Sequence, residues 1–250
     1  MDLGLSGKNA IVTGGSKGIG RSIALGLASE GANIVICARG QEALDATVKE
    51  LEAFGVKAYA ESCDVSDTES LNIFFNAAKE SLGSVDILIN NTSGLGISDD
   101  EAGWKSSVDI DLMATVRATQ LVTPWMAEAG GGSILHISSI SALEAGPPPY
   151  STIKAALIAH AKSMALSLAG QNIRVNCIAP GSIFVEGGIW DMIKQNDPDM
   201  YNGTLSNIPF GRMGTPEEVA NAAVFLASSR ASWISGATLV VDGVQHKGIF

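Results

Sequence analysis

Short runs of β-branched and apolar residues alternate along this chain with longer stretches of helical periodicity. The runs lie at 10–13, 33–38, 58–62, 86–90, 132–138, 173–178 and 238–241, and the helical stretches at 21–29, 41–54, 67–82, within 101–129, at 150–170 and at 216–228. A strand, a helix and a second strand in succession usually form a parallel unit, because the helix carries the chain back across the sheet. We therefore predict an α/β protein with a Rossmann-like, doubly wound sheet of seven parallel strands and helices on both faces.

The alternation continues without interruption by an internal repeat, a low-complexity tract or a linker-like change of composition. Residues 1–250 are therefore expected to form a single domain. The one long stretch without a clear pattern is 181–214. A segment of that length inside a compact domain is usually functional, so we expect a mobile substrate lid at about 182–213.

Composition narrows the classes of partner. The formal net charge is −10 and no block of five like charges occurs, so neither nucleic acid nor an anionic membrane surface is an expected partner. Residues 1–9 lack the apolar core of a signal peptide, and no stretch reaches the roughly 18 apolar residues that span a bilayer. The cysteines and histidines form no cluster with the spacing of metal ligands. We expect a cytoplasmic protein with reduced thiols and no metal site.

A glycine-rich turn separates the first predicted strand from the first predicted helix. Glycine lets the backbone turn sharply and approach a pyrophosphate, whose charge is then met by free N–H groups at the start of the helix. Such a turn can be purely structural, but its position between a first strand and a helix favours a dinucleotide site. The candidate cofactor-binding residues in it are Gly14, Ser16, Lys17, Gly18, Ile19 and Gly20.

The end of the second predicted strand indicates which dinucleotide is bound. An NAD site usually has an acidic residue there, which hydrogen-bonds the adenosine ribose. This chain has Ala38 and Arg39 at that position and no carboxylate before Glu42, and Lys17 adds a cation from the glycine-rich turn. Each of these two residues, taken alone, could be an ordinary charged side chain on the surface. Together they favour NADP(H) over NAD(H), because two cations can hold a 2′-phosphate by charge-assisted hydrogen bonds.

Tyr150 and Lys154 are four residues apart at the start of a predicted helix, which places the phenol and the ammonium on one face. An adjacent ammonium stabilises a phenolate, so such a pair can move a proton to or from a carbonyl or alcohol oxygen. The spacing alone occurs by chance on many helices. Its context is more specific, because the preceding strand ends in Ser138 and Ser139 at the carboxyl edge of the sheet, where doubly wound folds bind ligands. A hydroxyl there can orient a substrate carbonyl.

These motifs, in this order, resemble the short-chain dehydrogenase/reductase family, in its NADP-preferring branch, whose members have about the length of this chain. The resemblance extends from Gly7 to about Gly243 and includes Asp64-Val65, Asn90-Asn91, Arg174-Val175-Asn176, Pro180-Gly181 and Val241-Asp242-Gly243. It implies that Ser139 orients the carbonyl, that Tyr150 is the acid and base, and that Lys154 holds the cofactor ribose. It also implies cofactor contacts from Tyr150 itself, from the backbone of Ile183, and from Asp64, Val65 and Asn90.

The same resemblance implies an assembly of several copies. Family relatives commonly form tetramers through two long helices, which correspond to 112–126 and 155–168 here. Both stretches carry apolar and small residues that can pair with copies of themselves. A homotetramer is therefore expected, with a dimer as the alternative.

Three positions depart from the family's pattern. Asp111 stands where many members have a catalytic asparagine, Thr92 follows the paired asparagines where alanine is usual, and Val185 replaces a cofactor-binding threonine. In the family, the asparagine binds a water that leads to the lysine, largely through its backbone carbonyl, which aspartate keeps. We therefore retain Asp111 as a catalytic residue and expect its carboxylate to favour the charged form of Lys154.

The expected lid is rich in apolar residues. It contains Phe184, Ile189, Trp190, Met192, Ile193, Met200 and Tyr201, together with several acidic residues and Lys194. These apolar side chains either line a pocket or pack the lid against its surroundings or another subunit. A lined pocket suits a neutral, hydrophobic ketone or secondary alcohol, which makes an NADP-dependent carbonyl reductase or alcohol dehydrogenase of small molecules the leading interpretation.

Two other functions stay open. One is a 3-oxoacyl-thioester reductase acting on acyl-carrier-protein substrates. Such family members tend to carry arginines near the ends of the two central helices, which this chain lacks at 126–129 and 167–171. The other is an NADPH-binding protein with little activity, for which Asp111 and Val185 would be early signs.

Overall fold

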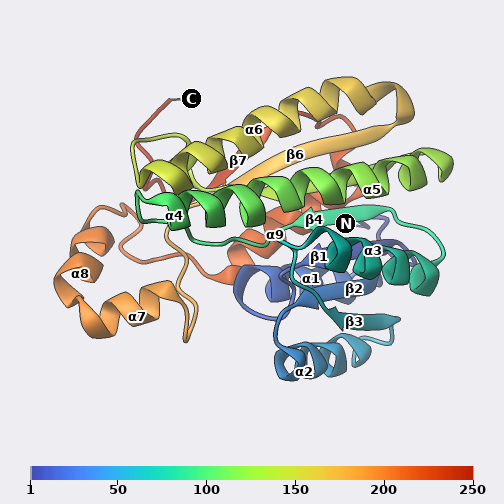
Figure 1. Cartoon of the computed structure of the whole chain (residues 1–250), viewed down its shortest axis with the longest axis horizontal. Helices are drawn as coiled ribbons and strands as arrows, with labels where there is room; N and C mark the ends of the chain where they lie inside the picture. Colours follow the sequence, from blue (N-terminus) through green and yellow to red (C-terminus); the bar gives the residue numbers. More distant parts are fainter. Residues whose placement is uncertain (1, 250) are drawn as a thin grey trace.

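The computed structural model describes residues 2–249 and contains one seven-stranded sheet (Figure 1). The strands are β1 (Asn9–Thr13), β2 (Asn33–Ala38), β3 (Ala58–Ser62), β4 (Ile87–Asn90), β5 (Gly132–Ile137), β6 (Ile173–Pro180) and β7 (Thr238–Val241). All neighbours are parallel, in the order β3-β2-β1-β4-β5-β6-β7. The strand order reverses between β1 and β4, and sheets of this kind bind ligands at the carboxyl ends of the strands beside that switch point. The predicted doubly wound parallel sheet is confirmed.

Helices cover both faces of the sheet (Figure 1). One apolar layer joins the sheet to α1 (Gly18–Ser29), α2 (Gln41–Glu52) and α9 (Pro216–Ala227), and the other joins it to α3 (Thr68–Leu82), α5 (Ala114–Glu128) and α6 (Pro148–Leu168). Three shorter helices are α4 (Glu101–Ser106), α7 (Ile189–Asn196) and α8 (Pro198–Ser206). Within the described residues no helix is both long and apolar enough to cross a bilayer.

The central strands are apolar along their whole length because both of their faces are covered. On β1, Ile11 and Val12 are both fully buried, yet they belong to the two different apolar layers. Successive side chains of a strand point to opposite faces, so each residue fills one layer. This double burial holds the carboxyl ends of the strands in fixed positions, and the candidate site lies at those ends.

About half of the segment 181–214 is helical. It contains α7 and α8, and the carboxylate of Asp197 caps α8 by accepting a backbone N–H from its first turn. Lys194 on α7 links the two helices to the preceding chain, because its Nζ lies 5.4 Å from the ring centre of Phe184 and 5.7 Å from that of Tyr201. Figure 1 shows both helices standing to one side of the sheet, where a lid would lie.

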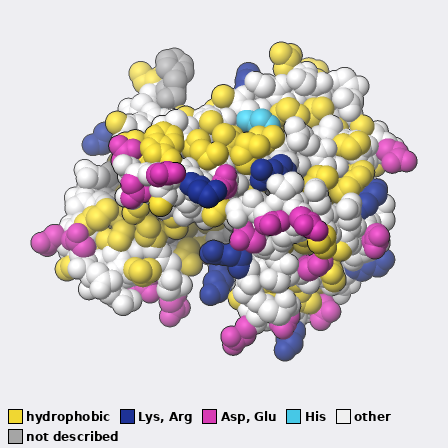
Figure 2. All heavy atoms as spheres, in the orientation of Figure 1, with side chains coloured by type: hydrophobic (Ala, Val, Ile, Leu, Met, Phe, Trp, Pro, Cys, Tyr) yellow, Lys and Arg dark blue, Asp and Glu magenta, His cyan; other side chains and the backbone are white. Residues whose placement is uncertain are grey.

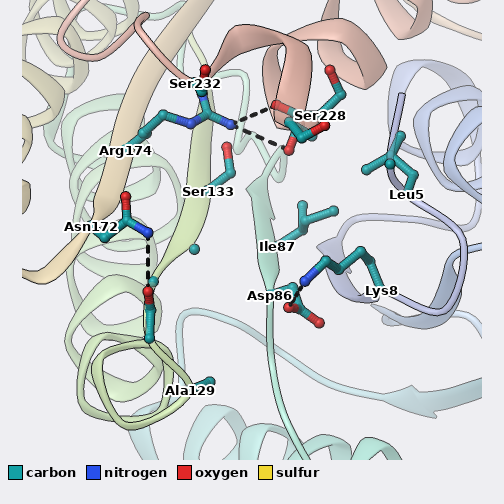
Figure 3. A pocket seen from close by; sticks show the side chains of 16 residues that line it. Leu5, Lys8, Asp86, Ile87, Ala129, Ser133, Asn172, Arg174, Ser228 and Ser232 are labelled. Atoms are coloured by element: carbon teal, nitrogen blue, oxygen red, sulfur yellow. Dashed lines mark hydrogen bonds and ion pairs between the residues drawn. The ribbon is translucent and has the colours of Figure 1, made fainter. Parts of the chain in front are cut away.

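A hollow of about 280 Å³ lies at the opposite edge, near the amino ends of β4, β5 and β6 (Figure 3). Arg174 faces it, but the terminal N–H groups of its guanidinium donate to the carbonyls of Leu226, Ala227, Ser228 and Ile234. The first three carbonyls come from the end of α9, where a cation is favourable. Arg174 therefore stabilises the fold, and the hollow lies away from the switch point.

Candidate active site

The glycine-rich turn between β1 and α1 is packed so closely that Gly20 has no room for a side chain. A Cβ there would overlap the carbonyl oxygen of Gly14 and the side-chain amide of Asn91. That amide donates to the carbonyls of Thr13 at 3.1 Å and Gly14 at 3.2 Å, so Asn91 braces the turn from β4. Within the described residues no side chain caps α1, which leaves its first N–H groups available for a pyrophosphate.

The turn rests directly on the end of β2. The N–H of Gly15 donates to the carbonyl of Cys37 at 3.1 Å, and the next residues along β2 lead to Arg39. Lys17 and Arg39 are both exposed, and in the described chain neither forms an ion pair. Two unpaired cations thus flank the place where the adenosine end of a dinucleotide binds in such folds.

Asp64 and Val65 follow β3. The carboxylate of Asp64 accepts hydrogen bonds from the hydroxyl of Ser66 at 2.7 Å and from its N–H at 3.0 Å. These bonds, with a smaller contribution from Arg39, hold the pKa of Asp64 below its ordinary value. The side chain of Val65 belongs to the apolar core, so this residue can reach a cofactor through its backbone only.

The side chain of Asn90 points into the layer between the sheet and its helices. Its amide lies 3.1 Å from Nδ1 of His136 and 3.5 Å from the hydroxyl of Thr119. Burial, helped by the neighbouring His160, lowers the pKa of His136 to about 3, so this pair is a neutral buried contact. Of the two asparagines, it is Asn91 that touches the glycine-rich turn, and the sequence prediction had named Asn90 alone as a cofactor contact.

The two serines after β5 have different tasks. Ser138 is buried, and its hydroxyl donates to the backbone carbonyl of Lys154 at 2.8 Å, which ties β5 to α6. Ser139 is half-buried, and its Oγ accepts the N–H of Ser141 at 3.1 Å. Because that bond uses an oxygen lone pair, the hydroxyl proton of Ser139 stays available for donation to a substrate oxygen.

Lys154 is buried, and its ammonium group forms one hydrogen bond and one ion pair. Its Nζ donates to the carbonyl of Ile137 at 3.1 Å and lies 2.9 Å from Oδ1 of Asp111, which is itself buried. The other carboxylate oxygen of Asp111 accepts the N–H of Gly94 at 2.8 Å. Burial by itself lowers the pKa of Lys154, but Asp111 and, secondarily, Tyr150 outweigh it, so the pKa of Lys154 lies above its ordinary value.

Asp111 reaches Lys154 because the helix that carries it is locally widened. Residues Ser107–Met113 form a π-helical turn between α4 and α5, a feature often found at functional sites. The backbone carbonyl of Asp111 accepts the hydroxyl of Thr115 at 2.8 Å. The link from Asp111 to Lys154 therefore runs through the carboxylate.

Tyr150 lies in the first turn of α6, which begins with Pro148 and Pro149 in the positions that proline favours. The Nζ of Lys154 lies 5.5 Å from the centre of the Tyr150 ring, so phenol and ammonium share one face of the helix, as the spacing predicted. The ring is half-buried, which leaves part of it accessible at the carboxyl edge of the sheet.

The segment after β6 closes the cofactor side of the site. Ile183 is buried and forms a β-bridge with Gly214, at the far end of the lid. Val185 and Ile19 of the glycine-rich turn both pack against the apolar core. The Oγ1 atom of Thr92 is buried and has no hydrogen-bond partner among residues 2–249.

These residues fit a nicotinamide dinucleotide. Because Gly20 has no side chain, the glycine-rich turn can fold tightly and bring its backbone close to a pyrophosphate. The unpaired Lys17 and Arg39 lie where the adenosine end of the cofactor would bind. The buried hydroxyl of Thr92 lies beside the turn and lacks a protein partner, as expected for a group that meets a ligand. In the described chain no group of three or more acidic, histidine or cysteine side chains could hold a metal ion.

Known proteins resemble this chain over almost its whole length. A family model described as enoyl-(acyl carrier protein) reductase matches residues 14–244. A 7α-hydroxysteroid dehydrogenase of Escherichia coli is 37% identical, with 97% of this chain and 95% of the relative covered. A 3-oxoacyl-[acyl-carrier-protein] reductase of Thermotoga maritima is 34% identical, with 96% and 98% covered.

Two solved structures have the same fold with a cofactor bound. A 7α-hydroxysteroid dehydrogenase in complex with NADH and 7-oxo glycochenodeoxycholic acid superposes with a TM-score of 0.91 at 36% identity, covering 100% of this chain and 98% of the other. An L-sorbose reductase from Gluconobacter frateurii in complex with NADPH and L-sorbose gives a TM-score of 0.89 at 36% identity, with 100% of both chains covered. Both kinds of nicotinamide cofactor therefore occur among close structural neighbours.

Proposed function

Since this chain belongs to the short-chain dehydrogenase/reductase family, whose members act on CH–OH and C=O groups, we propose that it uses NADP(H) to interconvert a neutral, hydrophobic ketone and its secondary alcohol. The observation that carries this proposal is the joint placement of Ser139, Tyr150 and Lys154 at the carboxyl edge of the sheet, with Lys154 kept charged by Asp111. A bound nicotinamide would supply or take up the hydride.

The chain's own residues handle the proton and the carbonyl oxygen. In the direction of reduction, the hydroxyl of Ser139 donates a hydrogen bond that orients the carbonyl, and the phenol of Tyr150 donates its proton to the oxygen as the alcohol forms. Lys154, which hydrogen-bonds the carbonyl of Ile137 and pairs with Asp111, stabilises the phenolate left behind and would also hold the cofactor ribose. In oxidation, each proton step runs in reverse.

We propose NADP(H) as the preferred cofactor because the end of β2 offers a cation instead of a carboxylate. Replacing both Lys17 and Arg39 by alanine is expected to lower the preference for NADPH over NADH by about 10²-fold or more, since each charge-assisted bond to a 2′-phosphate contributes about 1.5–3 kcal/mol. Affinities for both cofactors, measured by nucleotide fluorescence, test this. Lys57→Ala is the matched control, because it removes an exposed lysine that precedes β3, at the amino edge of the sheet and away from the cofactor site.

An unchanged NADPH-to-NADH ratio in the double variant would contradict the role of the two cations. A wild-type protein that prefers NADH would contradict the cofactor assignment itself, while leaving the proton chemistry untouched.

A hydrophobic substrate is supported by the lid. Figure 2 shows hydrophobic side chains gathered on the lid helices, and Ile189, Met192 and Met200 there are all more than one third exposed. Exposed apolar side chains grouped in this way are typical of binding surfaces. The similarity to a hydroxysteroid dehydrogenase supports the same choice.

A panel of ketones with NADPH tests the function. We expect the highest kcat/KM with apolar cyclic or aryl ketones, and lower values with a 3-oxoacyl thioester and with a sugar ketone such as L-sorbose. A clear preference for the thioester would replace the proposal by the acyl-carrier-protein alternative, which the Thermotoga maritima relative keeps open. Tight NADPH binding without turnover of any ketone would make the chain a binding protein.

We propose a homotetramer formed through α5 and α6. Figure 2 shows hydrophobic side chains over this region, and Leu166 on α6 is 84% exposed although it is apolar. Light scattering at micromolar concentration should give four times the chain mass, and Leu166→Glu should give smaller species. A monomer at all concentrations would contradict this assembly.

A further inference from the structure

Residues 242–246, which follow β7, form a short hook that is folded around the side chain of Asp242. One carboxylate oxygen of Asp242 accepts the N–H of Val244 at 2.9 Å, and the other accepts the N–H of His246 at 2.7 Å. Val244 has φ = +66°, in the left-handed region that β-branched residues rarely adopt. A strained residue of this kind persists only where its surroundings fix the backbone, and such residues gather at functional sites.

Gln245 of the hook binds the segment that follows β6. Its Oε1 accepts the backbone N–H of Ser182 at 2.8 Å, and its Nε2 donates to the hydroxyl of Ser182 at 3.0 Å. Ser182 is buried and immediately precedes Ile183. On the other side, the carbonyl of Ser182 accepts the N–H of Gly214 at 2.9 Å. The segment that leads to Ile183 is thus held between the hook and the end of the lid.

His246 binds a second loop of the site. Its Nε2 lies 3.3 Å from the backbone carbonyl of Leu143, which follows the short 3-10 turn Ile140–Ala142 that Ser139 caps. Figure 1 shows the carboxyl terminus above the start of α6, at the same end of the molecule as the lid. The hook therefore contacts both loops that flank Tyr150, the one carrying Ser139 and the one carrying Ile183.

We propose that Gln245 is a positioning residue, which fixes the backbone of Ile183 where the nicotinamide amide binds. Through the hook, it also fixes the position of Ile183 relative to the loop that carries Ser139. This rests on the proposed function, because it assumes a nicotinamide cofactor at Ile183. Two hydrogen bonds to one buried serine set the direction of its backbone, and geometry at this level matters because hydride transfer needs close alignment of donor and acceptor carbons.

The test compares Gln245→Met with Gln245→Glu. Methionine keeps the length of the side chain and loses both hydrogen bonds, whereas a glutamate carboxylate can accept from both the N–H and the hydroxyl of Ser182. We expect Gln245→Met to weaken NADPH binding by about tenfold or more, because two bonds to a buried serine are lost, and Gln245→Glu to restore most of that affinity. Gln171→Met makes the same replacement at an exposed glutamine far from the hook and is the matched control.

A fragment of the cofactor that lacks the nicotinamide distinguishes a positioning role of Gln245 from a general loss of structure at the binding site. Binding of 2′-phospho-ADP-ribose, measured by calorimetry, should be unchanged in Gln245→Met, because the hook acts on the nicotinamide end alone. Ser182→Ala, a milder change at the same contact, should give a smaller loss of NADPH affinity that is not additive with Gln245→Met.

The outcomes distinguish the two proposals. If wild type binds neither NADPH nor NADH, the proposed function fails. If wild type binds and Gln245→Met binds equally well, the positioning role alone is overturned. Equal losses of fragment and NADPH affinity would also overturn it, because they indicate a structural effect on the whole site. Should Gln245→Met not fold, Ser182→Ala still tests the contact, and an NADPH affinity equal to that of wild type in this variant would lead to the same rejection.

Discussion

Replacing Tyr150 with phenylalanine is expected to lower kcat/KM for ketone reduction by about 10³-fold, within the range that a positioned general acid contributes. The variant keeps the aromatic ring, whose centre lies 5.5 Å from Nζ of Lys154, and loses only the hydroxyl that donates the proton. Lys154 keeps its bonds to Ile137 and Asp111 in this variant. Affinity for NADPH and the thermal midpoint should therefore change little, so the loss belongs to the chemical step.

An exposed tyrosine on β3 offers a matched control for this variant. Tyr59→Phe removes the hydroxyl of a side chain that bonds Glu61, outside the proposed proton path. Its kcat/KM should stay close to that of wild type. A loss of less than about tenfold in Tyr150→Phe would contradict the assignment of Tyr150 as the acid, because even a weak general acid contributes more than that.

The parts of the fold that follow local rules could be predicted from the sequence. The expected strands at 33–38, 58–62 and 238–241 have the same bounds as β2, β3 and β7. Strands buried on both faces produce continuous apolar runs, and turn-forming residues between them mark their ends. The predicted parallel sheet also placed Ser139 at its carboxyl edge, whereas the strand order and the switch point between β1 and β4 come from the structure.

The lid helices were missed although their caps are visible in the sequence. Asp197 followed by Pro198 is a typical helix start, and the carboxylate of Asp197 caps α8. Both helices are short and bury no residue completely, so their apolar spacing carries little information. Helices of this length depend on tertiary contacts, here the stacking of Lys194 between Phe184 and Tyr201.

Contacts between distant segments could not be predicted from the sequence. The hook joins Gln245 to Ser182, and Asn91 braces a turn near the amino terminus, because the fold brings their strand ends to one edge. The π-helical turn that carries Asp111 has no sequence pattern of its own. We expected Asp111 to favour the charged form of Lys154, and the raised pKa of Lys154 agrees with that expectation. The hydrogen bond from Thr115 to the backbone carbonyl of Asp111 was not expected.

The second large effect is expected at Asp111. The side chains of Asp111 and Lys154 are only 1% and 2% exposed, so Asp111→Ala leaves a buried ammonium without its counter-ion. Removing one partner of such a pair costs about 3–5 kcal/mol in the free energy of unfolding. Asp109→Ala, on the same helical turn, removes the half-buried partner of the exposed Lys105 and should cost little. Urea unfolding at pH 7 measures both, and equal costs would contradict the importance of the buried pair.

The pH dependence of stability between pH 7 and 10 should differ between wild type and Asp111→Ala. In wild type the pKa of Lys154 is raised, so its contribution is complete below the ordinary lysine pKa of about 10.4 and is lost only as pH rises through the higher value in the folded state. Without Asp111, burial dominates and lowers the pKa of Lys154 in the folded protein. The variant should then gain stability as pH rises from 7 toward 10, and the difference from wild type should shrink.

Asp111→Asn separates the charge of this residue from its shape. The amide keeps the size of the side chain and can still accept the N–H of Gly94, but it no longer holds the pKa of Lys154 up. Lys154 then loses its proton at lower pH, and with it the charge that stabilises the Tyr150 phenolate. The alkaline fall in kcat/KM should therefore begin at lower pH in Asp111→Asn than in wild type. An unchanged pH–rate profile would mean that Asp111 holds Lys154 in place without setting its charge, because position alone does not depend on pH in this range.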